Sequence, residues 1–88
     1  MRRSRIEMKI DVLRACRKKT LKFTHILYKT NLGAVTAKQI LDDLTENNML
    51  ASVEVQKHAL YTTTNEGMKI IREFNEVCKA CGEPSETW

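Results

Sequence analysis

This sequence of 88 residues is short of several features that identify whole classes of protein. It has three glycines, and they do not form a glycine-rich loop of the kind that cradles phosphates. No apolar run approaches the ~18 residues needed to cross a bilayer, so we expect no membrane partner. Aromatic residues, 6% of the chain, lack the interleaved pattern typical of proteins that bind single strands. There is no internal repeat, and the length allows a single domain.

Cysteine is scarce as well, with three residues in all. An odd number argues against a framework of disulfides. The arginines near the start resemble the beginning of a secretory signal, but charged side chains interrupt the segment behind them. We therefore expect a cytoplasmic protein in a reducing compartment.

Cys78 and Cys81 have the spacing of one half of a zinc site. Structural zinc takes four ligands, and the chain has no second pair with this spacing. Two copies could supply four thiolates, or the cysteines could form an intermolecular redox pair. The simpler interpretation is that both continue the apolar face of the last helix. We expect no bound metal and no cofactor.

The sequence also offers little chemistry for catalysis. Neither His25 nor His58 lies in a recognisable ligand or nucleophile motif. A domain of this size lacks a pocket of the usual enzymatic volume. We expect a protein that is not an enzyme, and we infer no small-molecule effector.

What the chain does have is an uneven charge. Residues 1–40 carry eleven Lys and Arg against two acids, a net +9, whereas residues 41–88 carry a net −5. Such a distribution is typical of a protein with a nucleic-acid contact face. A solvated basic helix without a partner, or one attracted to an anionic membrane, is the alternative.

Hydrophobic periodicity and capping signals predict three helices in the first half of the chain. Ser4 and Glu7 form a capping box that opens a helix over residues 5–17. Thr20 is expected to cap a second helix over residues 21–30, which ends at the turn 31–33. Thr36 and Gln39 form another capping box, which opens a helix over residues 36–48 with Ala37, Ile40, Leu41 and Leu44 inward.

The period then changes to alternation, which predicts a β-hairpin over residues 51–64 with a loop at 57–59. A last helix is expected over residues 67–81, followed by a flexible tail at 82–88. Residues 1–81 thus form one mainly α domain with a small β-hairpin, an α+β class. The order α-α-α-β-β-α is that of a winged helix-turn-helix.

Two segments carry a resemblance to a known family. Residues 24–32 read THILYKTNL and resemble the T-x-I-M-Y-x-x-N-L stretch of small archaeal winged helix-turn-helix domains, which are predicted transcriptional regulators. The spacing of Tyr61, Thr64 and Gly67 is similar to the Y-x-x-T-x-x-G that leads from wing to last helix in that family. Related crenarchaeal nucleoid proteins dimerise through a long C-terminal coiled coil. Gly33 departs from the pattern, because a Ser usually caps the recognition helix there.

The winged helix architecture places helix 36–48 in the major groove of double-stranded DNA and the hairpin 51–64 as the wing. The residues expected to contact bases are Thr36, Lys38 and Gln39, since Lys can bind guanine and Gln can pair with adenine. The residues expected to contact phosphates are Arg2, Arg3, Arg5, Arg17, Lys18, Lys19, Lys22, Lys29, Lys57 and His58.

The last helix is expected to form a homodimer through Ile70, Phe74, Val77 and Cys81, unless its apolar face packs back on its own domain. The leading hypothesis is a sequence-specific transcriptional regulator. An architectural DNA-binding protein is the first alternative. A winged helix used for protein contact is the second, because Asp42, Asp43 and Glu46 are expected on the outer face of helix 36–48 and would weaken its fit to DNA.

Overall fold

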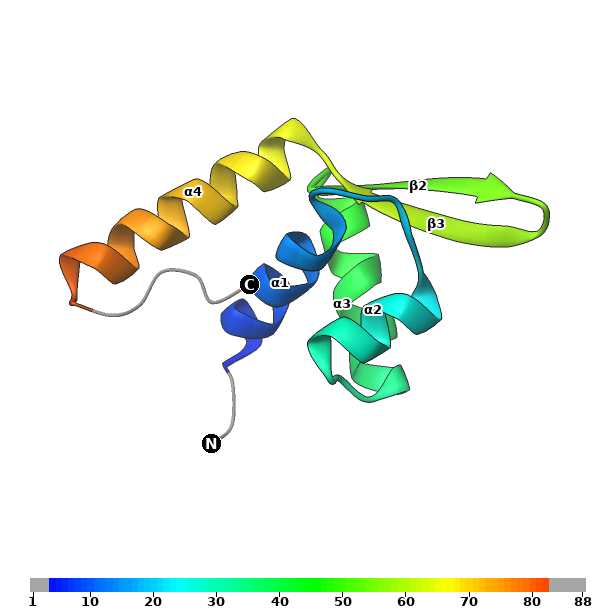
Figure 1. Cartoon of the computed structure of the whole chain (residues 1–88), viewed down its shortest axis with the longest axis horizontal. Helices are drawn as coiled ribbons and strands as arrows, with labels where there is room; N and C mark the ends of the chain where they lie inside the picture. Colours follow the sequence, from blue (N-terminus) through cyan, green and yellow to red (C-terminus); the bar gives the residue numbers. More distant parts are fainter. Residues whose placement is uncertain (1–3, 83–88) are drawn as a thin grey trace.

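The computed structural model describes residues 4–82 (Figure 1). The elements are α1 (Arg5–Cys16), β1 (Leu21–Lys22), α2 (Phe23–Thr30), α3 (Ala34–Glu46), β2 (Leu50–Val55), β3 (His58–Thr63) and α4 (Asn65–Ala80). Their order confirms an α+β winged helix, with one strand that the sequence did not predict. Arg2, Arg3 and residues 83–88 of the expected tail lie outside the described residues.

The capping box at the start of α1 is confirmed in both directions. The Ser4 hydroxyl accepts from the Glu7 backbone N–H at 3.2 Å, and the Glu7 carboxylate accepts from the Ser4 N–H at 3.2 Å. This pair satisfies two of the amide groups that a helix start leaves without intrahelical partners. The helix ends at Cys16, one residue earlier than predicted.

The predicted second helix over residues 21–30 is wrong at its start. Leu21 and Lys22 form β1, which pairs antiparallel with Tyr61 and Leu60 of β3. The sheet therefore has three strands in the order β1-β3-β2. Thr20 is not the cap, because Lys22 occupies that position and makes no side-chain capping bond. Two residues are too short to show the alternation that marks a strand in sequence.

The recognition helix α3 begins at Ala34, two residues before the predicted start. Gly33 is its N-cap in an extended conformation, and the Gly33 carbonyl accepts from the Ala37 N–H at 2.9 Å. Thr36 therefore lies inside the first turn rather than capping it. The helix ends at Glu46, and Asn48 follows with φ 63°. The left-handed conformation at Asn48 is the one expected of an Asn that follows a helix.

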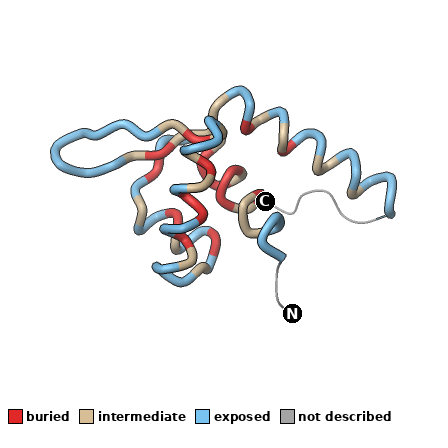
Figure 2. The backbone as a smooth tube through the Cα atoms, turned by 180° about the vertical axis from the view of Figure 1, so that it is seen from behind, coloured by how far each residue is buried: buried red, intermediate tan, exposed pale blue. Residues whose placement is uncertain are grey.

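The wing turns more tightly than the predicted loop 57–59. The strands are joined by Gln56 and Lys57 alone, with φ values of 50° and 68°. Positive φ at both central residues is the pattern of a two-residue turn whose twist matches the flanking strands. The sequence signal for a two-residue turn is weak here, because neither Gln56 nor Lys57 is the Asn or Gly that usually marks such a turn. Residues 52–59 are all exposed, so the outer wing projects from the body (Figure 2).

The core lies where α1, α2 and α3 meet the base of the sheet (Figure 2). The largest fully buried side chains are Ile10, Val12, Leu13, Cys16, Ile26, Thr30, Ile40 and Leu41. The four residues predicted to point inward from α3 are all buried. Burial raises the pKa of the Cys16 thiol to about 12, an effect that the nearby Lys29 charge partly opposes.

The start of α4 is fixed by a close approach to the connection between α3 and β2. Thr64 is the N-cap: its hydroxyl accepts from the Gly67 N–H at 3.2 Å and donates to the Asn48 carbonyl at 2.6 Å. Its own N–H donates to the Met49 carbonyl at 3.0 Å. A β-carbon on Gly67 would collide with that same carbonyl oxygen and with the Thr63 methyl group. Only glycine fits at this position without a shift of the backbone.

We expect Gly67→Ala to lower the free energy of unfolding by about 1–3 kcal/mol, because it overpacks a site closed by backbone atoms. Gly33→Ala is the matched control, since a β-carbon there meets nothing within 4 Å. Urea denaturation followed by circular dichroism measures both changes. Equal stability of the two variants would show that α4 can move away from Met49 at little cost.

Candidate nucleic-acid interface

The outer face of α3 carries apolar, polar, basic and acidic side chains. Val35, Lys38, Gln39, Asp42 and Glu46 are all exposed, and Val35 is 74% exposed. Thr36, one of the three predicted base-contact residues, is half-buried. Val35 was missed because the capping box placed the start of the helix one residue after it. The true start at Ala34 puts Val35 in the first, most exposed turn.

Three ion pairs determine how this face is charged. Lys38 pairs with Asp42 at 3.4 Å on the outer surface of α3. Asp43 instead turns toward α1, where it pairs with Arg5 at 3.1 Å and Lys9 at 3.7 Å. Its predicted outward position is therefore wrong, because the helix faces α1 on this side. Arg5, an expected phosphate contact, belongs to α1, and its guanidinium is bound to Asp43 of α3.

A small hollow beside α2 gathers basic side chains. Its volume is about 160 Å³, and its lining residues are Arg14, Ala15, Arg17, Lys18, Lys19 and Lys29. Four of these had been predicted as phosphate contacts. Arg14 is held in place by Asn75 at 2.8 Å and by Asp11 at 3.8 Å, and it lies 5.7 Å from the centre of the Phe74 ring. The hollow is smaller than the ~300 Å³ or more of ordinary ligand pockets.

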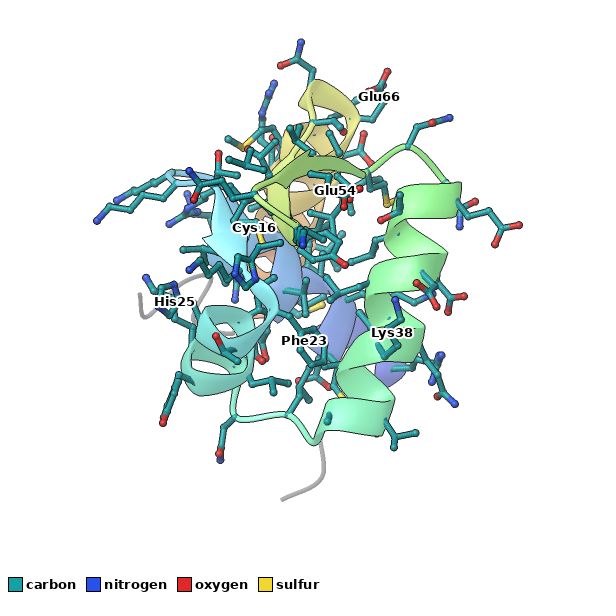
Figure 3. The ribbon with its side chains drawn as sticks, turned by 90° about the vertical axis from the view of Figure 1, so that its right-hand side faces the viewer. Cys16, Phe23, His25, Lys38, Glu54 and Glu66 are labelled. Carbon is teal, nitrogen blue, oxygen red and sulfur yellow. The ribbon has the colours of Figure 1, made fainter. Side chains whose placement is uncertain are left out.

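The remaining basic residues are distributed over other surfaces. Lys22 is exposed on β1, and Lys57 and His58 are exposed at the tip of the wing. In Figure 3, Lys38 on α3 and His25 on α2 lie on the two sides of the molecule, below Glu54 of the wing. The loop between α1 and β1 is on the α2 side, away from α3. The predicted phosphate residues thus form separate groups around the helix-turn-helix.

The predicted dimer residues of α4 fall into two classes. Ile70 and Phe74 are half-buried and pack against the core of their own domain. Val77 is 60% exposed, and Cys81 is exposed at the C-cap. The inner half of α4 therefore packs back on the body, and the outer half extends beyond it (Figure 1).

Within residues 4–82 no three His, Cys, Asp or Glu side chains gather where they could hold a metal ion, and Cys78 and Cys81 are free thiols. None of the described helices has the length and apolar character needed to cross a bilayer.

Solved structures with this fold include several regulators and DNA-binding proteins. Sso10a-2, a DNA-binding protein from Sulfolobus solfataricus, matches with a TM-score of 0.77 and 24% identity over 90% of this chain and 85% of that one. NolR from Sinorhizobium fredii matches with a TM-score of 0.71 and 18% identity over 80% and 71% of the two chains. BpsR of Bordetella bronchiseptica matches with a TM-score of 0.72 and 20% identity, over 76% of this chain and half of its own length.

These likenesses concern the fold. In sequence, no curated protein matches the chain. The profile of the winged helix-turn-helix family, however, matches residues 2–81, almost the whole chain. The protein belongs to the winged helix-turn-helix family.

Proposed function

We propose that this protein binds double-stranded DNA as a sequence-specific transcriptional regulator. The observation that carries the proposal is the group of basic side chains around the helix-turn-helix, above all the hollow lined by Arg14, Arg17, Lys18, Lys19 and Lys29. The fold of the chain also matches that of Sso10a-2, a DNA-binding protein, and this likeness supports DNA as the partner. The role is one of binding rather than catalysis.

In this proposal α3 enters the major groove with its amino-terminal end first. That end carries the partial positive charge of the helix dipole, and its exposed side chains include no acid before Asp42. Asp42 and Glu46 lie further along and would repel phosphates if the helix lay flat in the groove. The carboxyl-terminal half of α3 therefore points away from the backbone.

Phosphate contacts hold the domain on the duplex. The basic hollow lies on the α2 side, so it would receive phosphates that flank the bases beneath α3. Lys57 and His58 at the wing tip would reach the backbone on the other flank. Each such contact releases counterions, which makes the affinity depend on salt.

We expect Lys18→Ala combined with Lys19→Ala to reduce the slope of log affinity against log salt by about one to two. The measurement is a titration of a random duplex of 20–30 base pairs at several salt concentrations. The matched control is Lys69→Ala with Lys79→Ala, which removes the same charge from exposed positions on α4. If only the Lys69→Ala, Lys79→Ala control reduced the slope, the phosphate contacts would lie on α4 and not at Lys18 and Lys19.

A regulator and an architectural protein differ in their preference for sequence. We expect a duplex selected from a random pool to bind at least 10³-fold more tightly than random duplex at fixed salt, as is usual for specific binding. A ratio near one would favour the architectural role. No binding to either duplex would favour a winged helix that contacts protein, a role for which the carboxylates of Asp42 and Glu46 are suited.

The outer half of α4 is proposed to form the homodimer. Val77 is the best probe of this interface, because Ile70 and Phe74 also support their own core. We expect sedimentation equilibrium to give twice the chain mass of 10.2 kDa, and Val77→Asp to weaken association at least tenfold by burying a charge.

Val53→Asp is the control for the dimer, since Val53 is an exposed valine on the wing. The same loss of association in this variant would place the interface on the wing. A monomer at every concentration tested would show that α4 serves its own domain only.

A further inference from the structure

The first two turns of α3 expose an apolar side chain and an amide side by side. Val35 is 74% exposed in the first turn, and Gln39 is exposed one turn later. Residues four apart in a helix lie on the same face, and their Cα atoms are separated by about 6 Å along the axis. Base pairs are ~3.4 Å apart along a duplex, so the two side chains span one or two base-pair steps.

Val35 is the large apolar side chain exposed on a helix face that otherwise carries charged and polar groups. Nothing in residues 4–82 covers it, and the adjacent Gly33 leaves open space around the start of the helix. The major groove offers one apolar group, the 5-methyl group of thymine. A β-branched side chain on the leading turn of a recognition helix is suited to that contact.

Lys38 is less suited to read guanine than its position suggests. Its ammonium group pairs with the Asp42 carboxylate at 3.4 Å. A contact with guanine would take Lys38 away from Asp42 and leave an unpaired carboxylate facing an anionic groove. The ion pair between Lys38 and Asp42 is solvent-exposed and contributes little to stability by itself. Within the groove, however, Lys38 would neutralise Asp42, the acid nearest to the first two turns of α3.

We propose that α3 reads an A·T-containing step, with Val35 against a thymine methyl group and Gln39 paired with an adenine, while Lys38 neutralises Asp42. The inference rests on the proposed DNA binding and adds to it the class of base pair that is read. Val35 then acts as a specificity-determining residue. Gln can form two hydrogen bonds with adenine through its amide, which makes it the natural partner at the second position.

The test begins with duplexes selected by the wild-type protein from a random pool of 20 base pairs. Each thymine of the selected site is then replaced by deoxyuridine, which removes the methyl group and leaves base pairing unchanged. We expect one position at which wild-type affinity falls about fourfold, the value for one buried methyl group. Val35→Ala should be insensitive to that same replacement.

Gln39→Ala should lose about tenfold in preference for adenine at a pair one or two steps away. Ile6→Ala is the control, because Ile6 is an exposed β-branched side chain on α1, and its sensitivity to deoxyuridine should equal that of the wild type. Circular dichroism checks that each variant folds.

Four outcomes would overturn the inference. A guanine-rich selected site whose recognition is lost in Lys38→Ala would assign the readout to Lys38. Equal sensitivity of wild type and Val35→Ala to deoxyuridine would remove Val35 from the contact. Tight binding without any selected sequence would remove base readout but leave DNA binding in place, whereas the absence of all DNA binding would reject the proposed function as well.

Discussion

The close approach of α4 to the backbone between α3 and β2 sets the position of the other elements. Thr64 binds the carbonyl of Asn48 and the amide of Gly67, and the backbone N–H of Thr64 binds Met49. The neighbouring Thr63 hydroxyl donates to the Leu13 carbonyl at 2.7 Å and so connects the same joint to α1. The end of α3, the base of the wing, α1 and α4 meet at one small, fully bonded junction. These bonds connect the start of α4 to α1 and to the segment between α3 and β2.

Much of the fold could be predicted because its signals are local. The capping box of Ser4 and Glu7 and the inward stripe of α3 depend on residues within one or two turns, and both are present. Features that depend on distant partners could not be read in this way. β1 exists because Leu21 meets Tyr61, forty residues away, and α3 begins at Ala34 because an extended Gly33 serves as its cap without a side chain. The capping box predicted at Thr36 and Gln39 is also a local signal, but Thr36 is not the N-cap of α3, because Gly33 occupies that position.

In the candidate site, too, local features could be predicted from the sequence, whereas contacts between distant residues could not. Charge along the sequence placed Arg17, Lys18, Lys19 and Lys29 among ten expected phosphate contacts, and the structure brings these four around one hollow. Sequence could not show that Asp43 and Arg5 would bind each other, since that pair joins residues 38 apart. Removing Asp43 from the outer face makes α3 less acidic than the sequence suggested. Starting the helix two residues earlier brings Val35 onto the exposed outer face of α3.

The exposed outer wing has a dynamic consequence. Residues 52–59 form paired strands, but no helix or second sheet covers either face of them. Their amides are protected by the ladder alone, so this part should open locally and exchange hydrogen at a lower free energy than the body. A partner that holds the wing must first reduce its conformational freedom, and part of the binding free energy is used for that ordering. Variation at Gln56, the turn residue to which no phosphate contact is assigned, can therefore tune affinity without any change in the contacts themselves.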